Sequence, residues 1–227
     1  MSDRELRFAM VVSTSGSVMN EVLRNDFFRS RVHQIVVDRP GLAQEKARSH
    51  GIPATIIPNE DVERFCARLL RLFDEMAIDY VFSFYTSFFS ADFREAYRDR
   101  ILNFHPSLLP AFKGMDGFGD TVRYAARFAG NTVEFIADVM DEGKIVMQTA
   151  CPVDPGAPTE LIRHQVFVQQ CKALLQVARW LQEGRIEVDG HQIQVTGATF
   201  GCASFSPALD NDEVALWCPP DPYSPSR

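Results

Sequence analysis

Residues 101–110 read Ile-Leu-Asn-Phe-His-Pro-Ser-Leu-Leu-Pro (ILNFHPSLLP), and this stretch decides how the chain is interpreted. Its first half is apolar and strand-like, and it ends at Pro106, which lacks a backbone donor and restricts the residue before it. Asn103 and His105 are two positions apart, and side chains alternate along a strand, so both point to the same face. We therefore expect an amide and an imidazole to meet at the end of a strand.

The residues before this stretch alternate between apolar strands and helical segments. Strands separated by helices of this length imply right-handed crossovers. We predict an α/β fold with a mainly parallel, Rossmann-like sheet and helices on both faces. Ligands bind beyond the carboxyl ends of the strands in such sheets. The expected strands are Leu6–Ser13, Val32–Asp38, Ala54–Ile57 and Tyr80–Tyr85, and the expected helices are Met19–Phe28, a segment ending at His50, and Glu60–Met76.

The residues after Pro110 predict a mixed second half. The glycine-rich segment Phe112–Asp120 suggests a mobile loop near His105. The stretch beyond Gly197 is rich in Pro, Ser and Asp and has no periodicity, so we expect it to be an irregular tail. The other expected elements are helices Thr121–Phe128 and Thr159–Glu183, strands Thr132–Asp138 and Lys144–Val153, and a short C-terminal Asp-Gly hairpin within Glu187–Thr196.

Composition excludes several classes of protein. The chain of 227 residues is 46% hydrophobic and can bury a substantial core. Its net charge of -7 argues against a general nucleic-acid binder. No apolar run approaches the ~20 residues of a membrane span, and the first residues lack the layout of a signal peptide. Five widely spaced cysteines favour neither a disulfide framework nor a metal site, so we expect a cytoplasmic protein.

The turn Thr14–Ser17 follows the first expected strand and leaves two alternatives open. Small residues before a helix can bring backbone N–H groups to a phosphate. Such a turn can equally well connect strand and helix without binding anything. The dinucleotide fingerprint is absent, because Gly16 is the only glycine there.

Two motifs together resemble a known family. The stretch NFHPSLLP, from Asn103, resembles the N-x-H-P-S-L-L-P signature of formyltransferases that use 10-formyltetrahydrofolate. The run DEGKIVMQ, from Asp141 to Gln148, resembles their D-x-G-x-I-x-x-Q signature. The region from Arg7 to Ile186 is most similar to the glycinamide ribonucleotide transformylase branch. The resemblance implies the formyltransferase fold, with a catalytic domain over residues 1–197 and an irregular C-terminal extension over 198–227.

The resemblance places the catalytic asparagine, histidine and aspartate of the family on Asn103, His105 and Asp141. A neutral amine attacks the formyl carbon, and negative charge grows on the formyl oxygen. Asn103 and protonated His105 would donate to that oxygen. Asp141 would favour the charged imidazole and accept the proton of the amine through a water molecule. No metal is required.

The resemblance also implies two binding regions. The co-substrate 10-formyltetrahydrofolate is expected to contact Thr86, Ser87, Phe88, Phe89, Asn103, Ala137, Asp138, Val139, Met140 and Asp141. The amine acceptor is expected to contact Ser15, Gly16, Ser17 and Gln170.

Several departures from the transformylase pattern concern the substrate. The phosphate-binding turn of that branch is richer in Gly and Asn, its substrate-binding glutamate falls at or beside Gln170, and Glu134 replaces a common histidine. The segment FSFYTSFF, at 82–89, replaces the usual lining of the folate cleft. These departures favour an acceptor other than glycinamide ribonucleotide.

Four hypotheses follow for the function. The first is an N-formyltransferase acting on a small-molecule amine, such as a nucleotide-linked amino sugar or a siderophore or natural-product amine or hydroxylamine. The second is glycinamide ribonucleotide transformylase of purine biosynthesis. The third is a formyltetrahydrofolate hydrolase, and the fourth, from another class, is a non-catalytic folate-binding module. We expect no nucleic-acid or membrane partner, and a homodimer stays open.

Overall fold

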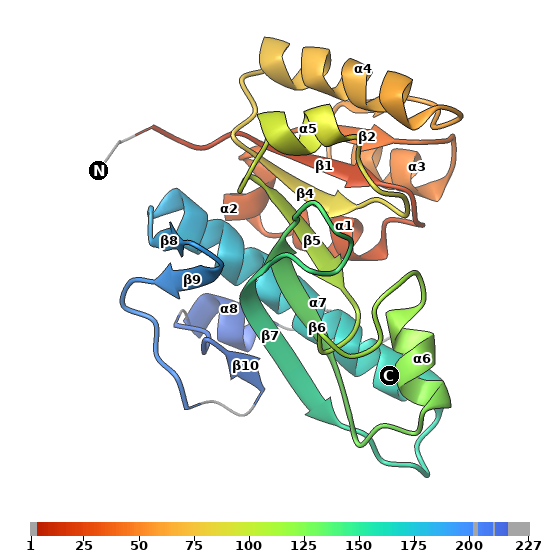
Figure 1. Cartoon of the computed structure of the whole chain (residues 1–227), viewed down its shortest axis with the longest axis vertical. Helices are drawn as coiled ribbons and strands as arrows, with labels where there is room; N and C mark the ends of the chain where they lie inside the picture. The colour runs from red at the N-terminus through yellow and green to blue at the C-terminus, as the bar shows by residue number, and fades with distance from the viewer. Residues whose placement is uncertain (1–3, 202–203, 211, 218–227) are drawn as a thin grey trace.

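A computed structural model describes residues 4–201, 204–210 and 212–217. Its main sheet has the order β10-β7-β6-β5-β4-β1-β2-β3 (Figure 1). Neighbouring strands in the series β3, β2, β1, β4 and β5 are parallel. The strands β6, β7 and β10 extend this sheet with antiparallel pairs. The predicted mainly parallel α/β fold is therefore confirmed. The strands are β1 (Phe8–Val12), β2 (Val32–Val37), β3 (Ala54–Ile56), β4 (Tyr80–Phe84), β5 (Ile101–His105), β6 (Phe128–Phe135), β7 (Lys144–Pro152) and β10 (Phe205–Ser206).

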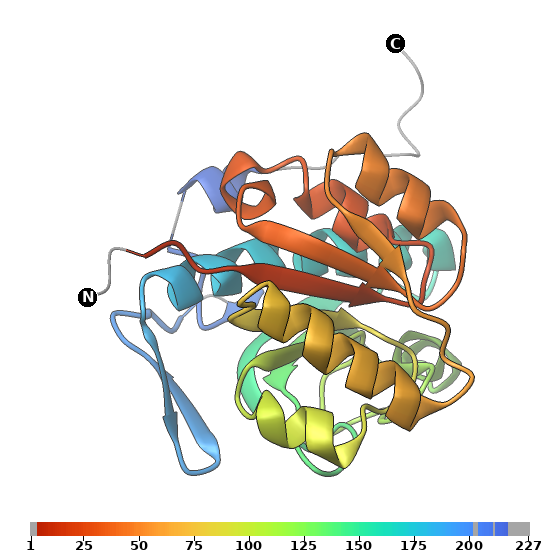
Figure 2. The same ribbon diagram turned by 90° about the horizontal axis from the view of Figure 1, so that it is seen from above.

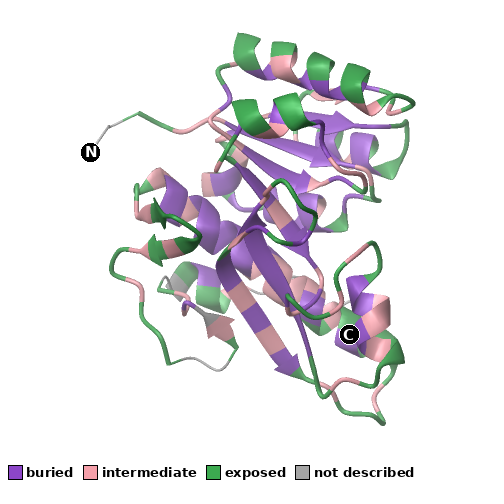
Figure 3. Cartoon of the chain, in the orientation of Figure 1, coloured by how far each residue is buried: buried purple, intermediate pink, exposed green. Residues whose placement is uncertain are grey.

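Helices cover both faces of this sheet. Figure 2 shows α4 and α5 on one face and α7 on the other. All five residues of β1 are buried, because both faces of the central strands are covered (Figure 3). The helices are α1 (Ser17–Val22), α2 (Asp26–Arg29), α3 (Leu42–Ser49), α4 (Val62–Glu75), α5 (Ala91–Ala96), α6 (Gly117–Arg123), α7 (Thr159–Gln182) and α8 (Asp212–Leu216).

Helix α4 shows how local sequence fixes an element. The Asp61 side chain accepts a hydrogen bond from the Arg64 N–H at 3.1 Å and caps the first turn. Phe65, Leu69 and Phe73 recur at helical spacing and are fully buried. Their burial seats α4 against the sheet.

Several expected elements differ from the structure. The predicted helix Thr121–Phe128 has the wrong bounds, because α6 ends at Arg123 and Phe128 already begins β6. The predicted helix Met19–Phe28 is divided into α1 and α2, because the side chain of Asn25 caps a new helix by accepting the Phe28 N–H at 3.2 Å. The predicted loop Phe112–Asp120 is partly helical. Asp116 accepts the Gly119 N–H at 3.2 Å, and α6 therefore begins at Gly117.

The C-terminal region contains more structure than its sequence predicts. The expected hairpin is present as β8 (Ile186–Asp189) and β9 (Gln192–Val195). Beyond it, where the sequence predicts irregular chain, β10 pairs with β7 and α8 packs on α7 (Figure 1). The indole N–H of Trp180 donates to Asp210 at 3.1 Å. These contacts attach the segment to the main domain.

The Val214→Ala variant is expected to lose about 2 kcal/mol of unfolding free energy, because Val214 on α8 is fully buried. Urea denaturation measures this loss. Substrate affinity should not change, since α8 contacts α7 away from the cavity described below. A raised Michaelis constant for the amine acceptor expected from the sequence would show instead that the C-terminal region reaches the cavity.

Candidate active site

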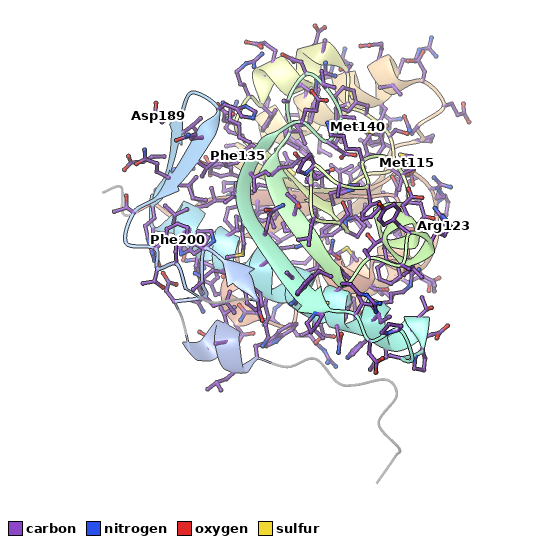
Figure 4. All side chains as sticks on the ribbon, turned by 60° about the horizontal axis from the view of Figure 1, so that its bottom comes forward. Met115, Arg123, Phe135, Met140, Asp189 and Phe200 are labelled. Atoms are coloured by element: carbon purple, nitrogen blue, oxygen red, sulfur yellow. The ribbon has the colours of Figure 1, made fainter. Side chains whose placement is uncertain are left out.

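A cavity of about 340 Å³ lies beyond the carboxyl ends of β1, β4 and β5. Its walls come from the turn after β1, the segment after β4, the end of β5, helix α7 and two loops. Met115, from the loop after β5, and Met140, from the loop after β6, lie on the same side of the molecule at this cavity (Figure 4). The cavity therefore occupies the position where open α/β sheets bind ligands.

His105 stands at the end of β5 and is 5% exposed. Its Nε2 lies 2.9 Å from the carbonyl oxygen of Phe112. A carbonyl oxygen can only accept, so Nε2 carries a hydrogen. The other nitrogen, Nδ1, lies 3.4 Å from Oδ1 of Asp141. This contact is an ion pair and not a hydrogen bond, so Nδ1–H of the doubly protonated ring stays available to a ligand in the cavity.

Asp141 lies in the turn between β6 and β7, where its backbone adopts a left-handed conformation with φ 57°. Its side chain is buried, and Oδ2 accepts the Gly114 N–H at 2.6 Å. Next to it, Lys113 forms an ion pair with Glu142 at 2.7 Å. The loop after β5 is thus attached to the Asp141 turn at two points.

Asn103 precedes His105 by two residues on β5, and both side chains line the cavity, as the spacing predicts. The amide nitrogen Nδ2 of Asn103 donates to Oε1 of Glu134 at 3.2 Å. Glu134 Oε2 accepts the Gly143 N–H at 2.9 Å. Burial raises the pKa of the Glu134 carboxyl. The sequence marked Glu134 only as a departure, and its contacts with Asn103 and Gly143 were missed.

Gln148 from the second motif forms hydrogen bonds that hold the turn after His105. Its Nε2 donates to the Leu109 carbonyl at 2.8 Å and to Thr132 Oγ1 at 3.1 Å. Thr132 in turn donates to the Ser107 carbonyl at 2.8 Å. The two motifs are therefore physically joined across β5, β6 and β7.

Most of the residues expected to bind the donor line the cavity. Ala137 and Asp138 do not, and the Asp138 carboxylate instead lies 3.8 Å from Nε of Arg94. The expected residues that line it are Thr86, Ser87, Phe88, Phe89, Asn103, Val139, Met140 and Asp141.

The four residues expected to bind the acceptor also line the cavity, on the walls formed by the turn after β1, the start of α1 and helix α7. Gly16 has φ 68°, and a side chain there would stand 2.9 Å from Cε of Met19. The hydroxyls of Ser15 and Ser17 are 3.2 Å apart. Gln170 Nε2 donates to the Phe104 carbonyl at 3.1 Å, so one of its two N–H groups is already engaged.

Arg163 lines the same cavity and was missed from the sequence. It lies on α7, and its guanidinium stands 4.2 Å above the ring of Phe118. Arg163 and Gln170 are seven residues apart, about 10 Å along the helix, and so share one side of it. The seven-residue spacing from Gln170, a residue already expected at the site, could have identified Arg163 from the sequence.

Two features are absent from the described residues. No cluster of His, Cys, Asp and Glu side chains suited to a metal ion occurs among them. Nor do they include a helix whose length and hydropathy suit it to crossing a membrane.

Known proteins resemble this chain over most of its length. Residues 6–178 match the family described as Formyl transferase. A phosphoribosylglycinamide formyltransferase of Bacillus subtilis (strain 168) is 27% identical over 168 residues, 70% of this chain and 86% of that protein. The trifunctional purine biosynthetic protein adenosine-3 of Gallus gallus is 25% identical over 192 residues, 81% of this chain, and the chain spans 19% of that protein. The crystal structure of glycinamide ribonucleotide transformylase 1 from Symbiobacterium toebii has a TM-score of 0.80 and 27% identity, over 86% of this chain and 95% of that one.

Proposed function

The chain belongs to the formyl transferase family, and we propose that it moves a formyl group from 10-formyltetrahydrofolate to the amine of a small-molecule acceptor. The observation that carries this proposal is the convergence of Asn103, His105 and Asp141 on one cavity, with His105 Nδ1 3.4 Å from the Asp141 carboxylate. This is the arrangement that the chemistry of formyl transfer needs.

The cavity supplies donors where charge develops. As the amine attacks, negative charge grows on the formyl oxygen. The Asn103 amide has a second N–H beyond the one given to Glu134. Protonated His105 supplies another at Nδ1, and both would stabilise this oxygen. The carboxylate of Asp141 stabilises the imidazolium and accepts the proton of the amine through a water molecule. The bond between the formyl carbon and the folate nitrogen then breaks, and that nitrogen takes up a proton and leaves as tetrahydrofolate.

The named relatives favour glycinamide ribonucleotide as the acceptor, since two of those above are transformylases of that compound. This was the second hypothesis from the sequence, and the comparisons support it better than the first. Arg163 adds a physical argument, because the acceptor carries a phosphate and Arg163 brings a cation to the wall of the cavity.

A second candidate is a different small amine, and Gln170 favours it. Glutamine carries no charge, and one N–H of its amide is engaged by the Phe104 carbonyl. An acceptor that needs a carboxylate at this place on α7 would find none on that side chain. The acceptor would then differ from that of the transformylases.

The Arg163→Ala variant is expected to raise the Michaelis constant for a phosphate-bearing amine roughly tenfold, because it removes a charge-assisted contact. The turnover number should change little, since the contact is remote from the reacting atoms. Steady-state kinetics test this, with Arg68→Ala, on the exposed side of α4, as the matched control. An unchanged Michaelis constant would rule out Arg163 as an anion contact.

The proposal is tested by incubating the protein with 10-formyltetrahydrofolate and a panel of amines while following the absorbance of the released tetrahydrofolate. The panel includes glycinamide ribonucleotide, nucleotide-linked amino sugars and hydroxylamines. Release that depends on glycinamide ribonucleotide supports the first acceptor, and release with another amine supports the second. Release without any amine would indicate a hydrolase. Donor binding without release would indicate a binding module.

A further inference from the structure

The Glu134 carboxylate joins two parts of the candidate active site. Its Oε1 accepts from the Asn103 amide on β5 at 3.2 Å, and its Oε2 accepts from the backbone of Gly143 at 2.9 Å, two residues beyond Asp141. The residue is 1% exposed, so these contacts are shielded from bulk water. Each carboxylate oxygen therefore has one buried N–H partner.

We propose that ionised Glu134 is a positioning residue, which orients the Asn103 amide and holds the Asp141 turn for formyl transfer. The proposal deepens the function given above and rests on it. Glu134 itself need not touch the reacting atoms. It acts through Asn103, which we assign to the formyl oxygen, and through Asp141, which we assign to the proton of the amine by way of a water molecule.

The first step of the argument concerns the Asn103 side chain. An amide has a donating end and an accepting end of similar size. If the oxygen of Asn103 faced an ionised carboxylate, two acceptors would face each other without a hydrogen between them. The carboxylate therefore selects the orientation with Nδ2 toward Glu134. One N–H of Nδ2 satisfies Glu134, and the second is left as a donor for the formyl oxygen.

The second step concerns how the backbone brings this carboxylate into place. The pairing of β6 with β7 shifts register between Val133 and Glu134. Such an irregularity changes the direction of a side chain. Gly143 then approaches closely, since a Cβ there would lie 2.1 Å from the Phe135 carbonyl and 2.8 Å from Oε2 of Glu134. Only glycine allows its N–H to reach this carboxylate.

The third step concerns charge. Burial raises the pKa of Glu134, and the facing carboxylate of Asp141 acts in the same direction. His105 and the two hydrogen bonds, from Asn103 and Gly143, act in the opposite direction. As the pH falls through this raised pKa, the Glu134 carboxyl gains a proton and can donate to the oxygen of Asn103. The Asn103 amide can then rotate so that its oxygen faces Glu134. Its NH₂ group would leave the position from which it donates to the formyl oxygen.

The free energy of unfolding should depend on pH in the opposite sense to the activity. A raised folded-state pKa means that the native protein favours protonated Glu134 above the ordinary value of 4.5. The stabilisation by this group is therefore fully present below 4.5 and is lost as the pH rises through the folded-state pKa. Ionisation thus favours the amide orientation that we assign to catalysis and destabilises the fold.

The structural half of the proposal is tested by NMR on the ¹⁵N-labelled full chain, with the Asn103 side-chain signals assigned from an Asn103→Ser spectrum. In the wild type, the Asn103 amide and the Gly143 N–H should titrate together, with one midpoint above the ordinary range for glutamate. In Glu134→Gln this shared midpoint should disappear. Signals that titrate equally in both proteins, or in neither, would overturn the proposal.

The catalytic half is tested by the pH dependence of turnover with an amine found active in the panel. Glu134→Gln should lower the turnover number roughly tenfold, because its NH₂ group cannot accept from both donors, and should remove the acidic ionisation from the profile. Glu75→Gln, at the exposed end of α4, is the control. A wild-type rate and profile in Glu134→Gln would overturn the positioning role. No turnover by the wild type with any amine would instead overturn the proposed function, and NMR would still decide whether Glu134 orients Asn103.

Discussion

Replacement of His105 by alanine is expected to slow formyl transfer by roughly 10²–10³-fold, the cost of one donor to a developing oxyanion. The fold should be retained, because the side chain lines the cavity and its removal takes no residue from the hydrophobic core clusters. Single-turnover release of tetrahydrofolate measures the loss. His191→Ala, on the exposed end of the β8–β9 hairpin, is the matched control.

A second substitution separates the two nitrogens of the His105 ring. The NH₂ group of glutamine can lie near the position of Nε2, which donates to the Phe112 carbonyl at 2.9 Å. Glutamine has no N–H donor near the position of Nδ1. His105→Gln should therefore be about as slow as His105→Ala if Nδ1 faces the reaction. Near-normal turnover in His105→Gln would show that the contact with Phe112, and not the pairing with Asp141, is what matters.

Replacement of Gly117 by alanine is expected to slow the reaction by about 10²-fold, the usual result of displacing a catalytic group by about 1 Å. A Cβ at Gly117 would lie 2.6 Å from Nε2 of His105 and 3.1 Å from the Phe112 carbonyl. The imidazole is expected to move, because its Nε2 is a side-chain atom, whereas the Phe112 carbonyl belongs to the backbone. Gly117 begins α6 without a left-handed backbone, so alanine suits its conformation otherwise.

The turnover number and the thermal unfolding midpoint of Gly117→Ala distinguish displacement from misfolding. Gly156→Ala is the control, since its nearest neighbour would be 3.4 Å from the new Cβ. We expect Gly117→Ala to fold normally and react slowly. A normally active variant would mean that the observed position of His105 is not required.

The sequence predicted the parts of the fold that local patterns determine. Apolar strands alternating with helices gave the α/β sheet, and the two-residue spacing of Asn103 and His105 placed both side chains at the cavity. The family resemblance added Asp141, which the turn after β6 brings to His105 at 3.4 Å. Their catalytic roles stay predictions until turnover is measured.

The parts that the sequence did not predict depend on single side chains or on contacts distant in sequence. Asn25 and Asp116 each begin a helix by capping it, at places where the apolar pattern alone suggested otherwise. Glu134 contacts Asn103 across strands, and Arg163 reaches the cavity by its place on α7. No local pattern indicates such contacts, because each depends on how separate elements pack.

The most direct test of the central claim is a single-turnover experiment with 10-formyltetrahydrofolate that carries ¹³C in the formyl group. With glycinamide ribonucleotide or another active amine present, ¹³C NMR should show the label on the nitrogen of the acceptor, and Asn103→Ala or Asp141→Asn should slow its appearance. Label that appears as formate, or that reaches the amine equally fast in these variants, would contradict the account.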